Sequence, residues 1–344
     1  MKDSIFGHLK IMHNIDVLTK KVEQLLFDIL KVDSLTGHEA VLADYLCNIL
    51  SQDGFEIMEI EHGVDRKSLV AKYGSPKIAF CSHLDTALPY NTPKRERNII
   101  YGIGAGDTKA SVATQIVFAQ ELRKQNKDIM LLLLAGEESD SVGAHSVIDK
   151  NLLNVDYMIH GEPTNGYIGE ATAGVIEIEL VAEGMVGHSS ILGFEQSSIY
   201  TLFINLNLMN QICKKKDWRF HIGSVHAGSS PGDFPLRSAA MVQIRSFCNI
   251  RKVLEILNMV VGNKAKMNII YASEPCFFHC VDGMKTKRFW FGSDASLFSG
   301  HCMQILLGPG NIERAHSVDE FISVDEIKVG IKNMIHVFQT LSDS

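Results

Sequence analysis

Residues 129–138 read Ile-Met-Leu-Leu-Leu-Leu-Ala-Gly-Glu-Glu, an apolar run that ends in a glycine and two adjacent glutamates. A short, continuous apolar run is typical of a strand that is buried on both faces of a mainly parallel sheet. Three more runs of this kind occur, at Ile78-Ala79-Phe80-Cys81, Tyr157-Met158-Ile159 and Gln304-Ile305-Leu306-Leu307. Together they predict the core strands of an α/β fold.

Four helices are expected around these strands. Apolar residues recur at helical spacing in Val22–Leu30, Val41–Leu50 and Val324–Leu341. Thr108–Lys124 also has the pattern of a helix, and Asp107 directly precedes it. An aspartate at that place is expected to cap the helix N-terminus.

The pattern changes near residue 170, where Ile176-Glu177-Ile178-Glu179-Leu180 alternates strictly between apolar and charged residues. Strict alternation is typical of a strand that has one face in water. Two helical and two strand-like segments follow, at Ile199–Ile212, Met241–Phe247, Val253–Val261 and Met267–Tyr271. This order predicts a small α+β domain with an antiparallel sheet, inserted at 170–273 into a discontinuous α/β domain formed by 1–169 and 274–344.

Length and charge limit the classes of partner. The 344 residues include 33 Lys and Arg against 40 Asp and Glu, which gives a formal net charge of −7. This acidic excess argues against binding to nucleic acid or to an anionic membrane, because such surfaces carry basic clusters. The basic run Lys214-Lys215-Lys216 is interpreted as a solvated helix end. The length suits about two domains at roughly 150 residues each.

The chain is expected to work in a reducing compartment, the cytoplasm. Its seven cysteines are irregularly spaced and include no Cys-x-x-Cys pair, so neither a thiolate zinc site nor a disulfide framework is expected. The first residues, Met1-Lys2-Asp3-Ser4-Ile5, lack the apolar core of a signal peptide. The longest apolar run, Ile129–Ala135, is far shorter than the roughly 20 residues of a membrane helix.

Polar clusters follow the predicted buried strands, at the edge where open α/β sheets bind their ligands. They are His83-Leu84-Asp85, Gly102-Ile103-Gly104-Ala105-Gly106-Asp107, Gly136-Glu137-Glu138, Gly161-Glu162-Pro163-Thr164 and Ala315-His316. Two histidines and several carboxylates without a thiolate suit a pair of divalent first-row ions, with zinc as the first choice and one carboxylate bridging them. Without metal, the same carboxylates would bring like charges together at a large cost once water is excluded.

Each cluster also has an ordinary structural interpretation when it is taken alone. His83-Leu84-Asp85 fits a surface turn, and adjacent glutamates such as Glu137 and Glu138 are common on surfaces. Gly102-x-Gly104-x-Gly106 partly fits a dinucleotide-binding loop. Asp107 at the start of the helix would repel a pyrophosphate, so we reject that interpretation.

Taken together, the motifs resemble the M20 metallopeptidases, a family that includes acetylornithine deacetylase, succinyl-diaminopimelate desuccinylase, aminoacylases and carboxypeptidase G. The resemblance covers nearly the whole chain, with the motifs in the family's order. It implies two divalent ions, zinc first and cobalt or manganese as alternatives, held by His83, Asp107, Glu138, Glu162 and His316. Asp107 takes the bridging position. Glu137 matches the catalytic base, which removes a proton from a water that the two ions activate, and Asp85 matches the aspartate that orients His83.

The same resemblance makes the inserted domain a ferredoxin-like lid that carries the interface of a homodimer. His188, in Gly187-His188-Ser189-Ser190, matches a histidine that reaches the neighbouring subunit's active site, where an oxyanion needs a donor. Arg245 matches the arginine that binds the substrate carboxylate, and Gly292-Ser293-Asp294 matches a loop that touches the same group. A non-proline cis peptide bond after Asp107 is implied as well.

Two positions depart from the family pattern. Gly232 stands three residues before Pro235, where an asparagine is usual, which leaves one polar substrate contact without its residue. Ile103 stands in the middle of the glycine-rich loop, where an arginine is common. The second departure is expected to matter less than the first.

The family hydrolyses amide bonds next to a free carboxylate, so the resemblance implies a small N-acyl amino acid as substrate. Residues 308–320 are closest to the deacetylase branch, which favours N-acetylornithine deacetylase, in arginine biosynthesis, with acetylcitrulline equally allowed. Desuccinylases more often carry Asn-Glu at Asp319-Glu320, so succinyl-diaminopimelate desuccinylase, in lysine biosynthesis, or another aminoacylase or peptidase of the family is the alternative. A non-catalytic metal-binding homologue is the rival from another class, and loss of the base or of a ligand would be its signature.

Overall fold

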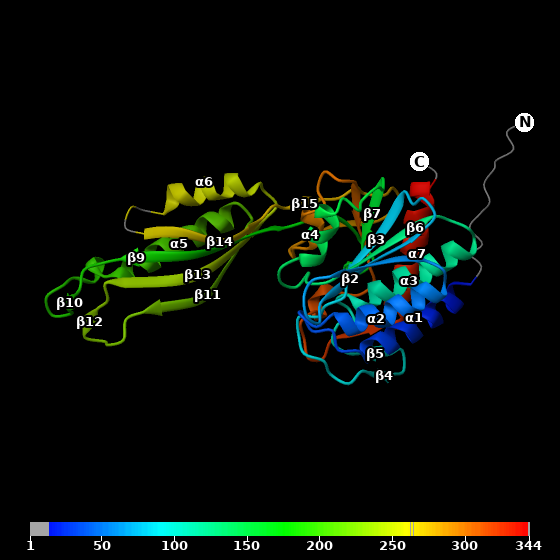
Figure 1. Ribbon diagram of the computed structural model, residues 1–344. Coiled ribbons are helices and arrows are strands. Elements are labelled where there is room, and N and C mark those ends of the chain that lie inside the picture. The colour runs from blue at the N-terminus through cyan, green and yellow to red at the C-terminus, as the bar shows by residue number, and fades with distance from the viewer. Residues whose placement is uncertain (1–13, 262, 264, 343–344) are drawn as a thin grey trace, which may run out of the picture. The chain divides into compact units, whose positions relative to one another are not determined.

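The chain divides into two compact units, which the computed structural model describes over residues 14–261, 263 and 265–342 (Figure 1). Unit 1 contains the described residues of Met1–Glu170, Phe278–Lys287 and Leu297–Ser344. Unit 2 contains those of Ala171–Phe277 and Arg288–Ser296. The segment 1–5, on which the expectation of no signal peptide rests, lies outside the described residues.

The large sheet is organised around the predicted apolar strands. Its nine strands run in the order β1-β2-β6-β3-β7-β17-β8-β15, with β16 paired to β8. Their bounds are β1 (Glu56–Glu61), β2 (Lys67–Tyr73), β3 (Ile78–His83), β6 (Ile129–Leu134), β7 (Tyr157–His160), β8 (Ile168–Thr172), β15 (Cys276–Phe277), β16 (Thr286–Phe289) and β17 (Met303–Leu306). The central strands β6, β3, β7 and β17 pair in parallel, whereas β1–β2, β2–β6 and β8–β15 are antiparallel. The expected α/β fold with a mainly parallel central sheet is confirmed.

Alternate residues of the central strands face two separate apolar clusters. Phe80 and Leu131 belong to the cluster that includes residues of the helices α1 (Ile15–Leu30), α2 (Ala40–Gln52), α3 (Lys109–Lys124) and α7 (Val324–Ser342). Cys81 and Leu132 belong to the cluster that includes residues of α4 (Val142–Asp149). Helices therefore cover both faces of the sheet, and the strands are apolar on both sides because neither side meets water.

The start of α3 differs from the expectation. The N-cap residue is Thr108, and its side chain makes no capping hydrogen bond. The expectation that Asp107 caps this helix is therefore wrong, because the Asp107 carboxylate faces two histidines instead of the helix. A small sheet, β18-β5-β4, holds the preceding loop; its strands are β4 (Lys94–Glu96), β5 (Ile99–Tyr101) and β18 (Phe321–Ser323).

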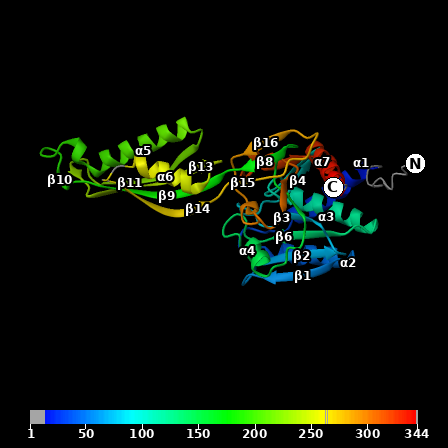
Figure 2. The same ribbon diagram turned by 90° about the horizontal axis from the view of Figure 1, so that it is seen from above.

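Unit 2 has the strand–helix–strand–strand–helix–strand order of a ferredoxin-like fold. The elements are β9 (Gly174–Glu183), α5 (Ser198–Lys215), β11 (Arg219–Ala227), β13 (Arg237–Ser246), α6 (Ile250–Val260) and β14 (Ala265–Ser273). The strands form an antiparallel sheet, β11-β13-β9-β14, and both helices run along it (Figure 2). Ile178, Val242 and Leu206 lie in the shared core. The predicted alternation in β9 and the antiparallel α+β order are confirmed.

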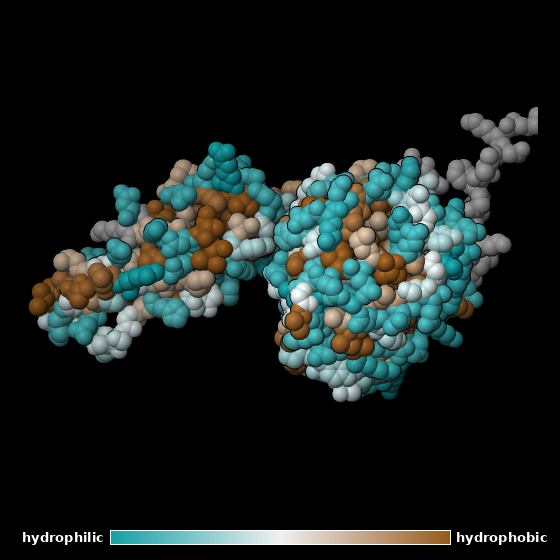
Figure 3. All heavy atoms as spheres, in the orientation of Figure 1, coloured by the Kyte–Doolittle hydropathy of each residue, from teal (hydrophilic) through white to brown (hydrophobic). Residues whose placement is uncertain are grey.

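Unit 2 also carries exposed apolar side chains near a small two-stranded sheet, in which β10 (Gly187–His188) pairs with β12 (Asp233–Phe234). Met185, Val186 and Phe194 are each more than half exposed, and Figure 3 shows apolar surface at this end of unit 2. Side chains of this size are more often buried. Among the helices of the described residues, none is long and apolar enough to cross a membrane.

Candidate metal centre

Three neighbouring strands bring predicted ligands of unit 1 to one edge of the large sheet. β6, β3 and β7 lie side by side and run parallel, so their carboxyl ends point the same way. His83 is the last residue of β3, the pair Glu137 and Glu138 follows β6, and Glu162 follows β7. Open α/β sheets bind ligands at this edge.

Asp107 lies between two histidines and presents one carboxylate oxygen to each. Its Oδ1 is 3.3 Å from His83 Nε2, and its Oδ2 is 3.7 Å from His316 Nε2. Glu138 Oε1 is 2.8 Å from the same nitrogen of His316. In the described residues, His83, Asp107 and Glu138 form a group whose candidate ligand atoms all lie within 4.8 Å of one another, and buried Glu162 lies outside this group. A carboxylate in the position of Asp107 can bridge two ions.

The hydrogen bonding of His83 fits a cation at this place. Its Nδ1 lies 2.9 Å from the backbone carbonyl oxygen of Asp85, which can only accept, so Nδ1 carries the hydrogen. In the neutral ring, Nε2 then points a lone pair at the Asp107 carboxylate, which is repulsive unless a proton or a metal ion lies between them. Burial disfavours the charged ring, but the carboxylates of Asp107, Asp85 and Glu137 outweigh burial and hold the pKa of His83 well above its usual value.

Two backbone features mark the segments that carry the ligands. The peptide bond between Asp107 and Thr108 is cis, which confirms the expectation from the resemblance. His316 has a φ of +57°, in the left-handed region that non-glycine residues rarely occupy. Residues held in that region cluster at functional sites. The hydrogen bond to Glu138 raises the pKa of the half-exposed His316 ring.

Glu137 lies beside the group of candidate ligands, not within it. Its Oε2 is 4.0 Å from His83 Nε2, and its side chain is 13% exposed. A carboxylate that adjoins a group of candidate metal ligands and still reaches water is placed to accept a proton from that water.

The side chain of Asp85 holds the segment that carries both glutamates. Its Oδ1 accepts the N–H groups of Gly136 (3.1 Å) and Glu137 (3.2 Å), and its Oδ2 accepts that of Glu138 (3.0 Å). The hydroxyl of Thr36 donates to the same Oδ2 at 3.0 Å. Asp85 is fully buried, so this carboxylate replaces water for three backbone amides.

The expected contact between Asp85 and His83 takes a different form. The carboxylate Oδ1 stands 3.5 Å from His83 Nδ1, whereas the backbone carbonyl oxygen of Asp85 stands at 2.9 Å. Both the backbone carbonyl and the carboxylate of Asp85 therefore face the ring, and the carboxylate also holds the Gly136–Glu138 segment.

In unit 2, the structure brings Arg245 together with the loop that carries Gly292 and Ser293. Arg245 Nη1 donates to the carbonyl oxygen of Trp290 at 2.9 Å. Arg245 also pairs with Val175 in β9, and a Cβ atom at Gly292 would lie 3.7 Å from Val175 Cγ2. Ser293 Oγ is buried without a hydrogen-bond partner among the described residues. A polar ligand group could satisfy that hydroxyl.

His188 lies beyond the opposite end of β9 from Arg245. Arg245 pairs near the start of β9, and the rest of that strand alone spans about 26 Å at roughly 3.3 Å per residue. The two predicted site residues of unit 2 are therefore not brought together within one chain. Ser190 N–H donates to His188 Nδ1 at 3.2 Å, so Nε2 carries the hydrogen in the neutral ring. A Cβ atom at Gly232 would lie 3.8 Å from this Nε2, so the position of the missing asparagine borders His188.

Comparison with known proteins assigns the family. Residues 79–340 match the model of peptidase family M20/M25/M40. The chain belongs to this family. A LysW-lysine/LysW-ornithine hydrolase from Saccharolobus islandicus is 31% identical over 95% of this chain and 97% of its own length. The crystal structure of aminopeptidase PepT from Bacillus cereus superposes with a TM-score of 0.80 at 19% identity, covering 94% of this chain and 99% of its own. The Bacillus subtilis YXEP protein, a dinuclear metal-binding M20 peptidase, superposes with a TM-score of 0.66 at 15% identity, covering 94% and 99%.

The glycine-rich loop of this M20 hydrolase binds a carboxyl group, and that group belongs to the protein's own Glu320. The Glu320 carboxylate accepts the N–H groups of Gly104, Gly106 and Asp107. Burial raises the pKa of Glu320 to about 7, although these hydrogen bonds lower it. The sequence assigns Glu320 no contact of this kind and marks it only as part of a segment that differs between family branches. The available signal was the run of glycines itself, whose free N–H groups require an acceptor.

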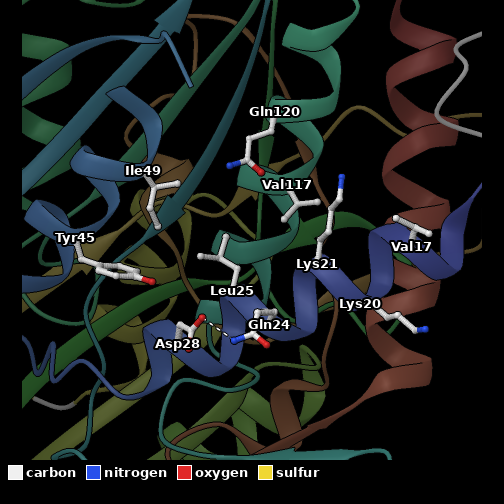
Figure 4. Close-up of a pocket in the computed structure, with 10 residues that line it drawn as sticks. All are labelled: Val17, Lys20, Lys21, Gln24, Leu25, Asp28, Tyr45, Ile49, Val117 and Gln120. Carbon is white, nitrogen blue, oxygen red and sulfur yellow. Dashed lines mark hydrogen bonds between the residues drawn. The ribbon is translucent and has the colours of Figure 1, made fainter. Parts of the chain in front are cut away.

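The M20 chain also has a surface pocket that contains none of the predicted site residues. Figure 4 shows it between α1, α2 and α3, with Leu25 and Val117 among its apolar lining and Lys21 and Gln120 among its polar groups. The candidate metal centre is therefore located by the chemistry of its ligand side chains and not by the shape of a cavity.

Proposed function

We propose that this M20 hydrolase is metal-dependent and cleaves the amide bond between an acyl group and an amino acid whose carboxylate is free. One observation carries the proposal: Asp107 offers one carboxylate oxygen to each of two histidines, and Glu137 lies beside them. Membership of peptidase family M20 supports hydrolysis of an amide bond.

The donor set fits two divalent ions, with zinc as our first choice and cobalt or manganese as alternatives. They would be held by His83, Asp107, Glu138, Glu162 and His316. When bound, such ions acidify a water and polarise the amide carbonyl. Glu137 accepts the proton of the attacking water and returns it to the nitrogen of the leaving amine. The dinuclear YXEP neighbour supports the number of ions.

N-Acetylornithine is the substrate that we favour, in arginine biosynthesis and in the cytoplasm. Residues 308–320 support the acetyl group, and Arg245 supports a free carboxylate, because a guanidinium can bind a carboxylate through two parallel hydrogen bonds. The S. islandicus relative, named for LysW-lysine and LysW-ornithine, favours a second candidate in which ornithine or lysine is released from LysW. Succinyl-diaminopimelate is the remaining alternative.

Metal content and a substrate panel test this proposal. The purified chain is expected to hold two metal ions, to lose hydrolysis on chelation and to regain it with zinc or cobalt. The panel contains N-acetylornithine, N-acetylcitrulline, LysW-ornithine, N-succinyl-diaminopimelate and a dipeptide. We expect kcat/KM for the acetylated amino acids to exceed the others by about tenfold or more. Faster succinyl or LysW cleavage overturns the acetyl assignment, and no cleavage of any amide by the metal-loaded chain overturns the enzyme proposal.

Glu137→Gln separates the base from the ligands. The amide keeps the shape of the side chain but cannot accept the proton, so we expect kcat to fall by roughly 10²- to 10⁴-fold with both ions retained. Exposed Glu96→Gln is the matched control and is expected to change neither activity nor metal content. Retained activity in Glu137→Gln would show that the base is another residue.

We also propose a homodimer in which His188 serves the partner subunit. The support is that His188 is exposed and lies beyond the far end of β9 from Arg245. Within the part of the chain that the structure describes, its Nε2–H has no hydrogen-bond partner, and such a donor is of the kind that stabilises an oxyanion. The exposed apolar residues near β10, which include Met185, Val186 and Ile191, offer a surface for a second copy.

Mixed dimers test the action of His188 in trans. His188→Ala and Glu137→Gln subunits, each nearly inactive alone, are expected to regain about a quarter of wild-type activity when equal amounts are mixed, since half the dimers are mixed and each then holds one intact site. Light scattering checks that both variants remain dimeric. A dimeric mixture that stays inactive would contradict the assignment.

A further inference from the structure

A buried carboxylate joins two segments that carry candidate ligands but lie far apart in the chain. Glu320 is 2% exposed, and its Oε1 accepts the N–H groups of Gly106 at 2.7 Å and Asp107 at 2.8 Å. Its Oε2 accepts the N–H group of Gly104 at 2.9 Å. One side chain therefore binds three amides in the loop that ends at Asp107.

The backbone of Glu320 belongs to the other segment. Its N–H donates to the carbonyl oxygen of Ser317 at 3.1 Å, in a turn that starts next to the histidine ligand of this segment. Asn91 forms a second link between the same two loops, because its Oδ1 accepts from Ile103 N–H and its Nδ2 donates to the carbonyl oxygen of Val318, both at 3.0 Å. The two loops are thus held by side chains at two points.

The glycine-rich loop also has backbone contacts: Gly102 N–H donates to the carbonyl oxygen of Glu320 at 3.0 Å, and Lys109 N–H donates to that of Gly104 at 2.8 Å. Gly104 has a φ of +83°, a conformation that glycine adopts freely because it has no Cβ atom. Removing the acceptor would leave three buried N–H groups unsatisfied, each of which costs about 1–3 kcal/mol. A loop that moves to recover them would carry the Asp107 carboxylate with it. Metal–ligand distances tolerate displacements of only about 0.2 Å, so the centre is sensitive to such a movement.

We propose that Glu320 is a positioning residue for the metal centre. It holds the amide of Asp107 on one side and the turn after His316 on the other, and so sets the spacing between the bridging carboxylate and the histidine on the second segment. The proposal rests on the metal centre of the proposed function and adds to it a residue that is neither a ligand nor the base.

Metal affinity of the apoprotein tests the role without relying on turnover. In Glu320→Gln, one oxygen becomes an NH₂ group that must face an N–H donor, so the loop cannot keep all three hydrogen bonds. We expect zinc affinity, measured by competition with a chelating dye, to fall by roughly 10- to 100-fold, as for other residues that support metal ligands. Activity at limiting zinc is expected to fall in parallel and to recover at excess zinc.

Glu23→Gln is the matched control. Glu23 is a buried glutamate of α1, paired with Arg95 at 2.5 Å, and none of its described partners carries a predicted ligand. It is expected to lower the melting temperature of the apoprotein without changing zinc affinity. Asn91→Ala is a milder variant of the second link and is expected to weaken zinc binding by about 3- to 10-fold, a measurement that remains available if Glu320→Gln does not fold.

The outcomes distinguish this inference from the proposed function. A wild-type chain that binds no zinc contradicts the metal centre itself. A wild-type chain that binds two ions, with wild-type affinity in folded Glu320→Gln or, if that variant does not fold, in Asn91→Ala, overturns the positioning role alone. Weaker binding in folded Glu320→Gln or, if that variant does not fold, in Asn91→Ala, with unchanged affinity in Glu23→Gln, supports it.

Discussion

In unit 1, buried carboxylates bind the backbone amides of the segments that carry the predicted site residues. In unit 2, the predicted site residues Arg245 and His188 make only a few side-chain contacts. In unit 1, Asp85 and Glu320 each accept three backbone N–H groups from a segment that carries candidate ligands. In unit 2, the Arg245 side chain contacts Gln243 Oε1 at 3.1 Å and the carbonyl oxygen of Trp290. Among the described residues, the exposed His188 side chain hydrogen-bonds only to Ser190, in its own turn.

This difference indicates that the metal ligands and the substrate-binding arginine meet different requirements. A buried carboxylate that binds several amides allows its loop one position, which suits ligands that must keep fixed distances from an ion. A half-buried arginine with two neutral partners keeps donors available and can adjust to a ligand. Changes in unit 1 are therefore expected to act on metal binding and kcat, and changes at Arg245 in unit 2 on KM.

Asp85→Asn is expected to have the largest effect of the changes that sharpen this comparison. The amide must turn its NH₂ group toward a backbone N–H or toward the Thr36 hydroxyl, so at least one hydrogen bond to the Gly136–Glu138 segment is lost. We expect kcat to fall by roughly 10- to 100-fold, with reduced zinc affinity. Steady-state kinetics at saturating substrate and zinc titration measure both.

Thr36→Val provides a graded control for Asp85→Asn. It removes one donor to Asp85 Oδ2 and leaves the three amides in place. Its effect on kcat should be several times smaller. Equal effects of the two variants would show that the carboxylate does not act through the amides.

The central strands could be predicted because strands that are buried on both faces consist almost entirely of apolar residues. Continuous apolar runs specify β3, β6, β7 and β17, and their parallel order places His83, Glu137 and Glu162 at one edge. The hairpin β1–β2 was not predicted. Four of the six β1 residues are exposed, and the charged residues in Glu56-Ile57-Met58-Glu59-Ile60-Glu61 hide the strand pattern.

The roles of buried polar groups were harder to predict, because they depend on partners that are distant in sequence. Glu320 binds amides more than 200 positions earlier in the chain, and no local pattern indicates that contact. Asp107 has the local sequence of an N-cap, but tertiary structure directs its carboxylate to His83 and His316. The polar clusters after the strands already include both histidines, and the family resemblance implied their roles as ligands and the cis peptide bond. The hydrogen bonds of Asp85 came from the structure.

Arg245→Lys is the corresponding test in unit 2, with an intermediate effect expected. A lysine cannot form two parallel hydrogen bonds to a carboxylate, so we expect KM to rise by about 10-fold with kcat nearly unchanged. Arg237→Lys is the matched control, because Arg237 lies on the same strand and forms an exposed ion pair with Glu179 at 3.0 Å. A fall in kcat without a change in KM for Arg245→Lys would contradict the substrate-binding role of Arg245.

The smallest expected effect concerns His62, which contacts the end of β6 through the Ser68 hydroxyl. Its Nε2 lies 2.8 Å from Ser68 Oγ, and this hydroxyl oxygen accepts the N–H group of Ala135. Burial, together with Arg66, lowers the pKa of His62 below its usual value. The unfolded chain therefore takes up this proton first as the pH falls below about 6.5, and the folded state loses stability in that range.

His62→Gln should flatten the fall in the free energy of unfolding between pH 6.5 and 5 by at most about 1.4 kcal/mol per pH unit, the contribution of one proton. Urea denaturation of both proteins across this range measures the difference in slope, to which the other titrating groups contribute equally. Identical slopes would mean that His62 takes up a proton as readily in the folded chain as in the unfolded one, and that this corner of unit 1 is less tightly closed to water than its hydrogen bonds indicate.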